Sequence, residues 1–116
     1  RLLLDTHVLL WALGEVRQLR PEVREAIADG RNVVYVSAAS VWEAAIKRQL
    51  GKLEAPGDLV EAIAQCRLQP LTITMAHAQH AAELPMVHQD PFDRMLVAQA
   101  QLEGLTLVTR DSRLRG

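Results

Sequence analysis

The chain has 116 residues, of which 49% are hydrophobic and 23% charged, a composition that suits one globular domain over residues 1–116 and excludes a disordered segment. Its formal net charge of -1 gives no overall attraction to nucleic acid or to an anionic membrane, and no apolar run is long enough to span a bilayer. A single cysteine excludes an internal disulfide and favours the cytoplasm.

Short apolar runs alternate along the chain with segments of helical spacing. Leu2-Leu3-Leu4 predicts a buried strand, and His7–Leu13 continues with helical spacing. A helix over 21–29 begins with proline, and the strand that follows over 32–37 is rich in β-branched residues. The remaining predicted elements are helices at Ser40–Leu50 and Asp58–Arg67, a strand at Leu71–Thr74, helices at Met75–Leu84 and Asp90–Glu103, and a strand at Leu105–Val108.

Strands separated by helices imply parallel crossover connections. The alternation therefore predicts an α/β fold, a three-layer α/β/α sandwich around a central, mostly parallel sheet. Such sheets bind ligands beyond the carboxyl ends of their strands. Because the chain begins at Arg1 and stops at Gly116, soon after a predicted strand, we also expect a few residues to be missing at each end.

Four acidic residues fall where this predicted edge should lie. Asp5 directly follows the first strand, and Asp111 comes three residues after the last one. Glu43 and Asp93 each lie in the first turn of a predicted helix. Since strand carboxyl ends and many helix amino ends share one edge of a parallel sheet, all four carboxylates are candidates for a single site.

Each acid also has a structural explanation. Asp5 can cap the helix after it, Asp111 can start a turn, and Glu43 can complete a capping box with Ser40. Asp93 suits the positive end of a helix that Asp90 caps. These explanations treat the acids singly, whereas carboxylates gathered at one edge would repel each other unless a bound cation neutralised them.

The chemical type of the donor atoms indicates which class of cation they would bind. Carboxylate oxygens are hard ligands, and no cysteine–histidine set accompanies them, so the pattern favours Mg²⁺ or Mn²⁺ over zinc or copper. Acid clusters that hold such ions serve phosphoryl chemistry, in which a metal-activated water attacks a phosphodiester. The charge objection to a nucleic-acid substrate also weakens, because the rest of the chain is net positive once these acids are set aside.

Four stretches together resemble the PIN-domain nucleases, and among them the VapC-type toxins of bacterial toxin–antitoxin pairs. The resemblance runs through essentially the whole chain, and the order and spacing of the stretches make it specific. They are Leu2-Leu3-Leu4-Asp5-Thr6-His7, Val36-Ser37-Ala38-Ala39-Ser40-Val41-Trp42-Glu43, Asp90-Pro91-Phe92-Asp93-Arg94-Met95-Leu96-Val97-Ala98-Gln99-Ala100 and Leu105-Thr106-Leu107-Val108-Thr109-Arg110-Asp111.

The resemblance implies a PIN-like α/β/α fold and a Mg²⁺- or Mn²⁺-dependent endoribonuclease. It also implies a homodimer, an RNA substrate and inhibition by a cognate antitoxin protein. By position, Asp5 and Asp93 match direct metal ligands, and Glu43 and Asp111 match the acids that complete the site. The small hydroxyl positions that orient carboxylates or water are matched by Thr6 and Thr109.

Several other residues have simpler structural explanations beside a possible functional role. Arg110 and Arg94 could grip substrate phosphates, although solvated surface charge is an alternative for both. Lys47 is interpreted as ordinary positive charge near a helix end, His77 as a surface residue, and Trp42 as part of the core or an interface. Two other functions stay open: a receiver-type phospho-acceptor domain, and a protein-interaction module whose acids are not catalytic.

Overall fold

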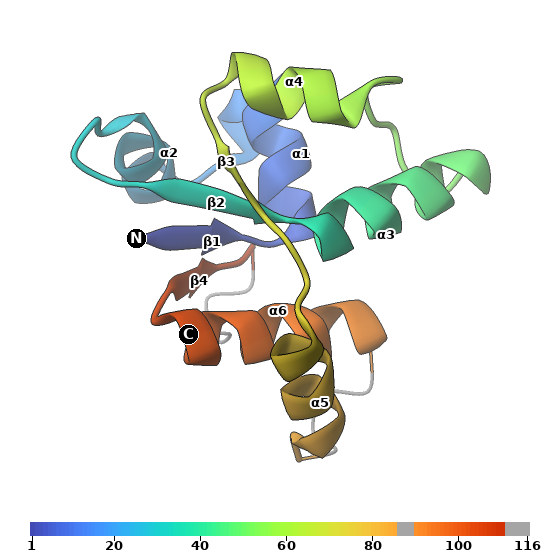
Figure 1. The fold of residues 1–116 in the computed structure, drawn as a ribbon. Helices are drawn as coiled ribbons and strands as arrows, with labels where there is room; N and C mark the ends of the chain where they lie inside the picture. Colours follow the sequence, from blue (N-terminus) through green and yellow to red (C-terminus); the bar gives the residue numbers. More distant parts are fainter. Residues whose placement is uncertain (86–89, 111–116) are drawn as a thin grey trace.

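A computed structural model describes residues 1–85 and 90–110 of the chain. Strands and helices alternate in it from the amino terminus onward, as Figure 1 shows. In chain order the elements are β1 (Leu2–Leu4), α1 (Thr6–Gly14), the 3₁₀ helix η1 (Val16–Gln18), α2 (Pro21–Ala28), β2 (Val34–Ser37), α3 (Ala38–Gln49), α4 (Leu59–Gln65), β3 (Gln69–Leu71), α5 (Met75–Glu83), α6 (Pro91–Glu103) and β4 (Thr106–Val108).

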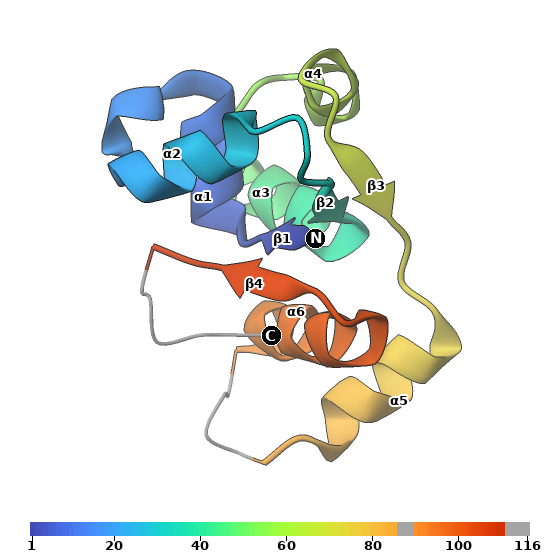
Figure 2. The ribbon, with the colours of Figure 1, turned by 90° about the vertical axis from the view of Figure 1, so that its left-hand side faces the viewer.

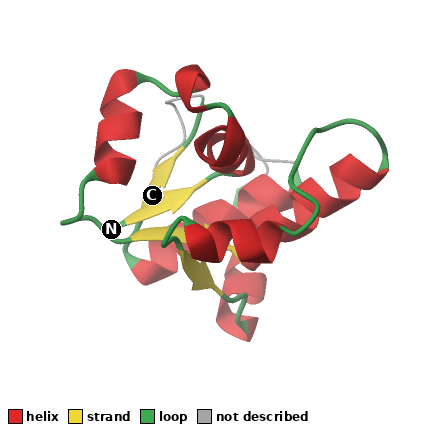
Figure 3. Ribbon diagram, turned by 90° about the horizontal axis from the view of Figure 1, so that it is seen from above, coloured by secondary structure: helices red, strands yellow, loops and turns green. Residues whose placement is uncertain are grey.

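The four strands form one parallel sheet in the order β3-β2-β1-β4. Strand β1 is central: Leu4 pairs with Val36 of β2 on one side and with Val108 of β4 on the other. The strands lie side by side when the molecule is seen from above in Figure 3. The predicted parallel α/β sandwich is confirmed, and its two central strands bring the segments after Leu4 and Val36 to the same edge.

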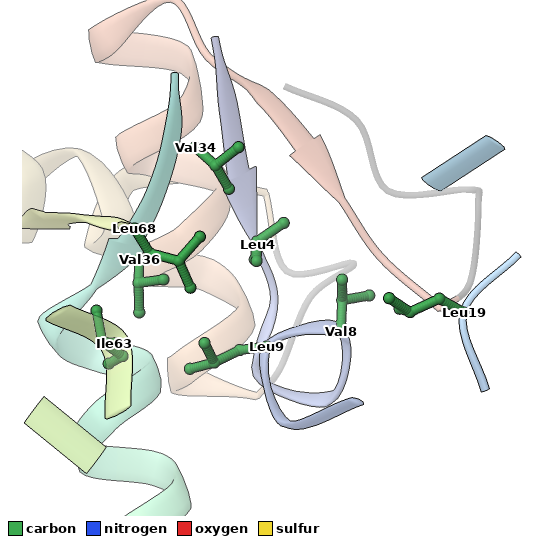
Figure 4. Packing of buried hydrophobic residues seen from close by; sticks show 8 residues of the cluster. All are labelled: Leu4, Val8, Leu9, Leu19, Val34, Val36, Ile63 and Leu68. Carbon is green, nitrogen blue, oxygen red and sulfur yellow. The ribbon is translucent and has the colours of Figure 1, made fainter. Parts of the chain in front are cut away.

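Side chains alternate between two apolar layers, one on each face of the sheet. Leu4, Val34 and Val36 pack with residues of α1 and α4 and with Leu19, which follows η1, in one cluster, shown in Figure 4. Leu3 and Leu107 point to the opposite face and pack against α6. Figure 2 shows α6 beneath β4, with α1 and α2 on the other side of the sheet. Burial of these aliphatic side chains drives the assembly of the layers.

Local capping decides where several helices begin. Asp58 and Asp90 accept backbone hydrogen bonds as the N-caps of α4 and α6, as predicted. Helix α3 is different, because it begins two residues earlier than predicted and its cap is Ser37, whose side chain accepts from the amide of Ala39. The expected capping box between Ser40 and Glu43 is therefore wrong, and Glu43 is left for another role.

Tertiary contacts overturn the surface assignment of His77. The side chain is buried at 1% exposure, with Nε2 2.8 Å from Oε2 of Glu103 and Nδ1 accepting from the backbone amide of Thr74. This bonding fixes α5 against α6. Across the described ranges, no helix is long and apolar enough to cross a membrane.

Candidate functional site

A pocket of about 230 Å³ opens at the carboxyl edge of the sheet. It collects residues from the segment after β1, from α3, from the start of α6 and from the segment after β4. Its walls carry four carboxylates and two cationic side chains. The lining residues are Asp5, Thr6, His7, Glu43, Lys47, Asp90, Asp93, Thr109 and Arg110.

Asp5 joins β1 to α1. Its backbone amide donates to the carbonyl of Val108 in the neighbouring strand, and its Oδ1 accepts from the amide of Val8 at 2.8 Å as the N-cap of α1. The capping explanation is thus correct, yet the same carboxylate faces the pocket. Burial, and then the negative charge of Asp93, raise its pKa from 3.8 to about 6, although amide hydrogen bonds from Val8 and Arg110 and the charge of Arg110 act in the opposite direction.

Glu43 is held from two directions on the wall formed by α3. The hydroxyl of Thr6 donates to Oε1 at 2.5 Å, and Nζ of Lys47 lies 2.6 Å from Oε2. Both Thr6 and Glu43 are buried, at 3% and 5% exposure. The hydrogen bond to Glu43 raises the pKa of Lys47, so this lysine stays an ammonium ion at neutral pH. A buried carboxylate with a hydroxyl and an ammonium partner is rigidly oriented.

The start of α6 supplies the third wall. Asp93 is half-buried in the first turn, where the helix dipole favours a negative charge. Asp90 lines the pocket too, but its Oδ1 also accepts from the amides of Phe92 and Asp93 as the cap of α6. The cap role inferred for Asp90 is therefore confirmed, and its carboxylate adds to the negative charge of the pocket.

A histidine and an arginine complete the rim. Burial, and then the positive charge of Arg110, lower the pKa of His7, which favours a neutral imidazole in the pocket. The ring of His7 makes an edge contact with Trp11, with 6.2 Å between the ring centroids. Arg110 is exposed beside Asp5, where its guanidinium could reach a phosphate that entered the pocket.

The structure thus brings together Asp5, Glu43 and Asp93, along with Thr6 and Thr109. Asp111 lies outside the described residues, so its part in the cluster stays a prediction. Arg94 does not line the pocket. Its guanidinium donates to backbone carbonyls at the end of α5 and just beyond it, those of Ala82, Leu84 and Pro85.

The structure adds to the sequence-based interpretation of two further residues. Lys47 lies in the last turn of α3, as expected, and it also lines the pocket; its i, i+4 spacing from Glu43 was the available signal. Trp42 is 62% exposed and meets Phe92 edge-to-face, with 5.4 Å between the ring centroids. This exposure excludes the core for Trp42, and the alternative role at an interface stays a prediction.

The pocket is chemically suited to a hard cation. Its donors are carboxylate and hydroxyl oxygens, and burial, with a smaller contribution from the charge of Asp93, raises the pKa of Asp5. Within 1–85 and 90–110, however, no three His, Cys, Asp or Glu side chains converge closely enough to hold a metal ion by themselves. Water molecules or a residue beyond these ranges would have to complete a coordination shell.

Comparisons with known proteins identify the family and agree with the fold. The PIN domain family profile matches residues 2–116. Ribonuclease VapC22 of Mycobacterium tuberculosis is 31% identical over 97% of this chain and 88% of its own length. Ribonuclease VapC16 of the same organism is 38% identical over 63 residues, a match that spans 51% of this chain and only 45% of that relative.

Solved structures share the architecture at low identity. The DNA-bound VapBC of Salmonella typhimurium matches with a TM-score of 0.70 and 20% identity, over 97% of this chain and 88% of that one. VapBC2 of Rickettsia felis, bound to a promoter DNA fragment, matches with a TM-score of 0.67 and 15% identity, over 96% of this chain and 88% of that one. A toxin–antitoxin complex from Klebsiella pneumoniae matches with a TM-score of 0.64 and 19% identity, over 97% of this chain and 88% of that one. These likenesses establish the fold.

Proposed function

Because the chain belongs to the PIN domain family, we propose that it is an endoribonuclease that hydrolyses RNA phosphodiester bonds with Mg²⁺ or Mn²⁺ and acts as the toxin of a toxin–antitoxin pair. The observation that carries the proposal is the convergence of Asp5, Glu43 and Asp93 on one pocket at the carboxyl edge of the sheet. The names of the two curated relatives, both ribonucleases, support the substrate class.

Asp5 and Asp93 would hold the divalent ion in this proposal. They come from distant parts of the sequence and line the same pocket, where burial, and after it the charge of Asp93, raise the pKa of Asp5. Asp111 and water would complete the coordination shell. When bound, a divalent ion supplies a water of lowered pKa and neutralises negative charge that develops on the leaving oxygen.

In this proposal the other pocket residues orient a carboxylate or a water molecule, or bind the substrate. Thr6 fixes the Glu43 carboxylate, which can then accept a hydrogen bond from water only in a defined direction. Thr109, buried at 9% exposure, lines the pocket on the β4 side and would orient a carboxylate or a water molecule there. Arg110 would bind a substrate phosphate at the rim, whereas Arg94, already bonded to carbonyls near the end of α5, anchors that segment instead.

The proposed partners are a cognate antitoxin protein and a second copy of this chain in a homodimer. The structural neighbours from Salmonella typhimurium and Rickettsia felis are VapBC proteins, which supports the antitoxin. The homodimer and a cytoplasmic location stay predictions from the family resemblance and from cysteine content, respectively.

RNA cleavage with and without metal tests the proposal. Mixed-sequence RNA is incubated with the wild-type chain in MnCl₂, in MgCl₂ and in excess EDTA, and in parallel with Asp93→Asn and Asp58→Asn. We expect wild type and Asp58→Asn to cleave only with metal, since Asp58 caps α4 outside the pocket. Asp93→Asn should lose activity by roughly 100-fold or more, the scale of removing one electrostatic stabiliser. Robust cleavage in EDTA would overturn the proposal. Folded protein that never cleaves would favour the interaction module.

A further inference from the structure

Lys47 places a positive charge inside the acidic pocket. It lies one helical turn after Glu43 on α3, and its Nζ is 2.6 Å from Oε2 of that residue. Both residues line the pocket, and the lysine side chain is 32% exposed whereas the glutamate side chain is only 7% exposed, so the carboxylate of the pair is shielded from solvent. The pair therefore differs from the screened surface pairs common on helices.

Both oxygens of Glu43 are already occupied by donors of this chain. Thr6 donates to Oε1 and Lys47 donates to Oε2, and the carboxylate has almost no remaining solvent contact. A metal ion that bound Glu43 directly would have to displace one of these donors. Glu43 in this arrangement can reach a metal ion through a bound water molecule, while Asp5 and Asp93 line other walls of the pocket.

We propose that Lys47 is a positioning residue that takes the place of a second cation beside Glu43, so that the pocket binds one divalent metal ion and not two. The inference rests on the proposed function, since it takes this pocket to be the metal site. Two divalent ions a few ångströms apart require several carboxylates to offset their repulsion. Here the ammonium group of Lys47 already compensates one of those carboxylates.

Neighbouring residues provide matched variants. Lys47→Met and Lys47→Gln remove the charge at a partly exposed position, and Lys47→Arg keeps it. Arg48 is the control: it is the next residue of the same helix, and its Nε donates to the carbonyl of Ala55 at 3.1 Å, away from the pocket. Glu43→Gln combined with Lys47→Met removes both members of the ion pair.

Calorimetric titration of the full chain with MnCl₂ at pH 7.5, without RNA, gives the number of ions bound. We expect one ion for wild type, Lys47→Arg and Arg48→Met. Lys47→Met and Lys47→Gln should bind two, because the uncompensated Glu43 becomes free to ligate a second ion. The double variant should return to one. Electron paramagnetic resonance of the same samples should show coupled Mn²⁺ pairs only in the two uncharged single variants.

The outcomes separate this inference from the proposed function. Two ions on the wild-type chain, or one ion on both uncharged variants, would overturn the role of Lys47 and leave a metal-dependent nuclease intact. No Mn²⁺ binding to folded wild-type chain would overturn the metal site itself, and the inference about Lys47 with it.

Discussion

Asp5 and Asp93 line the same pocket and their charges interact: burial, and after it the charge of Asp93, raise the pKa of Asp5 from 3.8 to about 6. The two residues lie at the start and near the end of the chain, and the parallel pairing of β1 with β4 brings their segments together. Negative charge is thereby concentrated at this edge of the sheet at neutral pH, which a bound cation would relieve.

The raised pKa of Asp5 predicts how the stability of the metal-free protein depends on pH. The folded state holds this proton more tightly than the unfolded state, so its contribution is fully present below pH 3.8 and is lost as pH rises through about 6. The loss amounts to at most about 3 kcal/mol in the free energy of unfolding. Urea unfolding in EDTA between pH 3.5 and 7.5 measures this loss. The quantity to compare is the difference in the free energy of unfolding between wild type and Asp5→Asn at each pH.

Asn at position 5 keeps the helix cap but carries no charge, so this variant should be the more stable protein above pH 6. A difference between the two proteins that does not change with pH would contradict the assigned titration.

Substitutions of Arg110 and Arg94 should have different effects, one on RNA binding and the other on the stability of the fold. In an Asp93→Asn background, in which cleavage is expected to be strongly reduced, Arg110→Gln should weaken binding to single-stranded RNA about tenfold, the scale of one charge-assisted hydrogen bond. Arg94→Gln should leave RNA affinity unchanged and lower the free energy of unfolding by roughly 1–2 kcal/mol, because carbonyls of Leu84 and its neighbours lose their donor. Fluorescence anisotropy and urea unfolding distinguish the two. An RNA-binding loss confined to Arg94→Gln would reverse these roles.

Alanine substitutions of two serines near the start of α3 should differ in their effect on stability. Ser37 caps the helix, so Ser37→Ala should cost about 1 kcal/mol of stability. The hydroxyl of Ser40 is buried and has no hydrogen-bond partner among the described residues, so Ser40→Ala should be neutral or stabilise the fold by up to about 1 kcal/mol. The midpoints of urea unfolding of the two variants and of the wild-type chain measure these differences. A marked destabilisation by Ser40→Ala would show that its hydroxyl is bonded after all.

Local signals explain why most of the fold could be predicted. Apolar runs such as Leu2-Leu3-Leu4 form strands because they fill two apolar layers, and Asp58 and Asp90 cap helices through contacts within three residues. The strand expected at Leu71–Thr74 lies instead at Gln69–Leu71. Its position is set by pairing with β2, where Ser37 meets Leu71, and this pairing leaves no mark in the local sequence.

The candidate site was predictable to the extent that topology determines it. The parallel order of strands places Asp5 and Glu43 at one edge, and the helix start places Asp93 there. The burial of His77 was not predictable, because it depends on Glu103 in another helix. The contact of Lys47 with Glu43 follows helical spacing, but its direction into the pocket depends on how α3 packs.

Anomalous diffraction from crystals soaked in MnCl₂ would test the metal site most directly, because it locates manganese without reference to activity. We predict a peak in the pocket within direct coordination distance, about 2.0–2.2 Å, of carboxylate oxygens of both Asp5 and Asp93. The peak should be absent from crystals of Asp93→Asn. Manganese bound elsewhere, or no peak between these two residues in well-ordered wild-type crystals, would contradict the proposed metal-dependent nuclease.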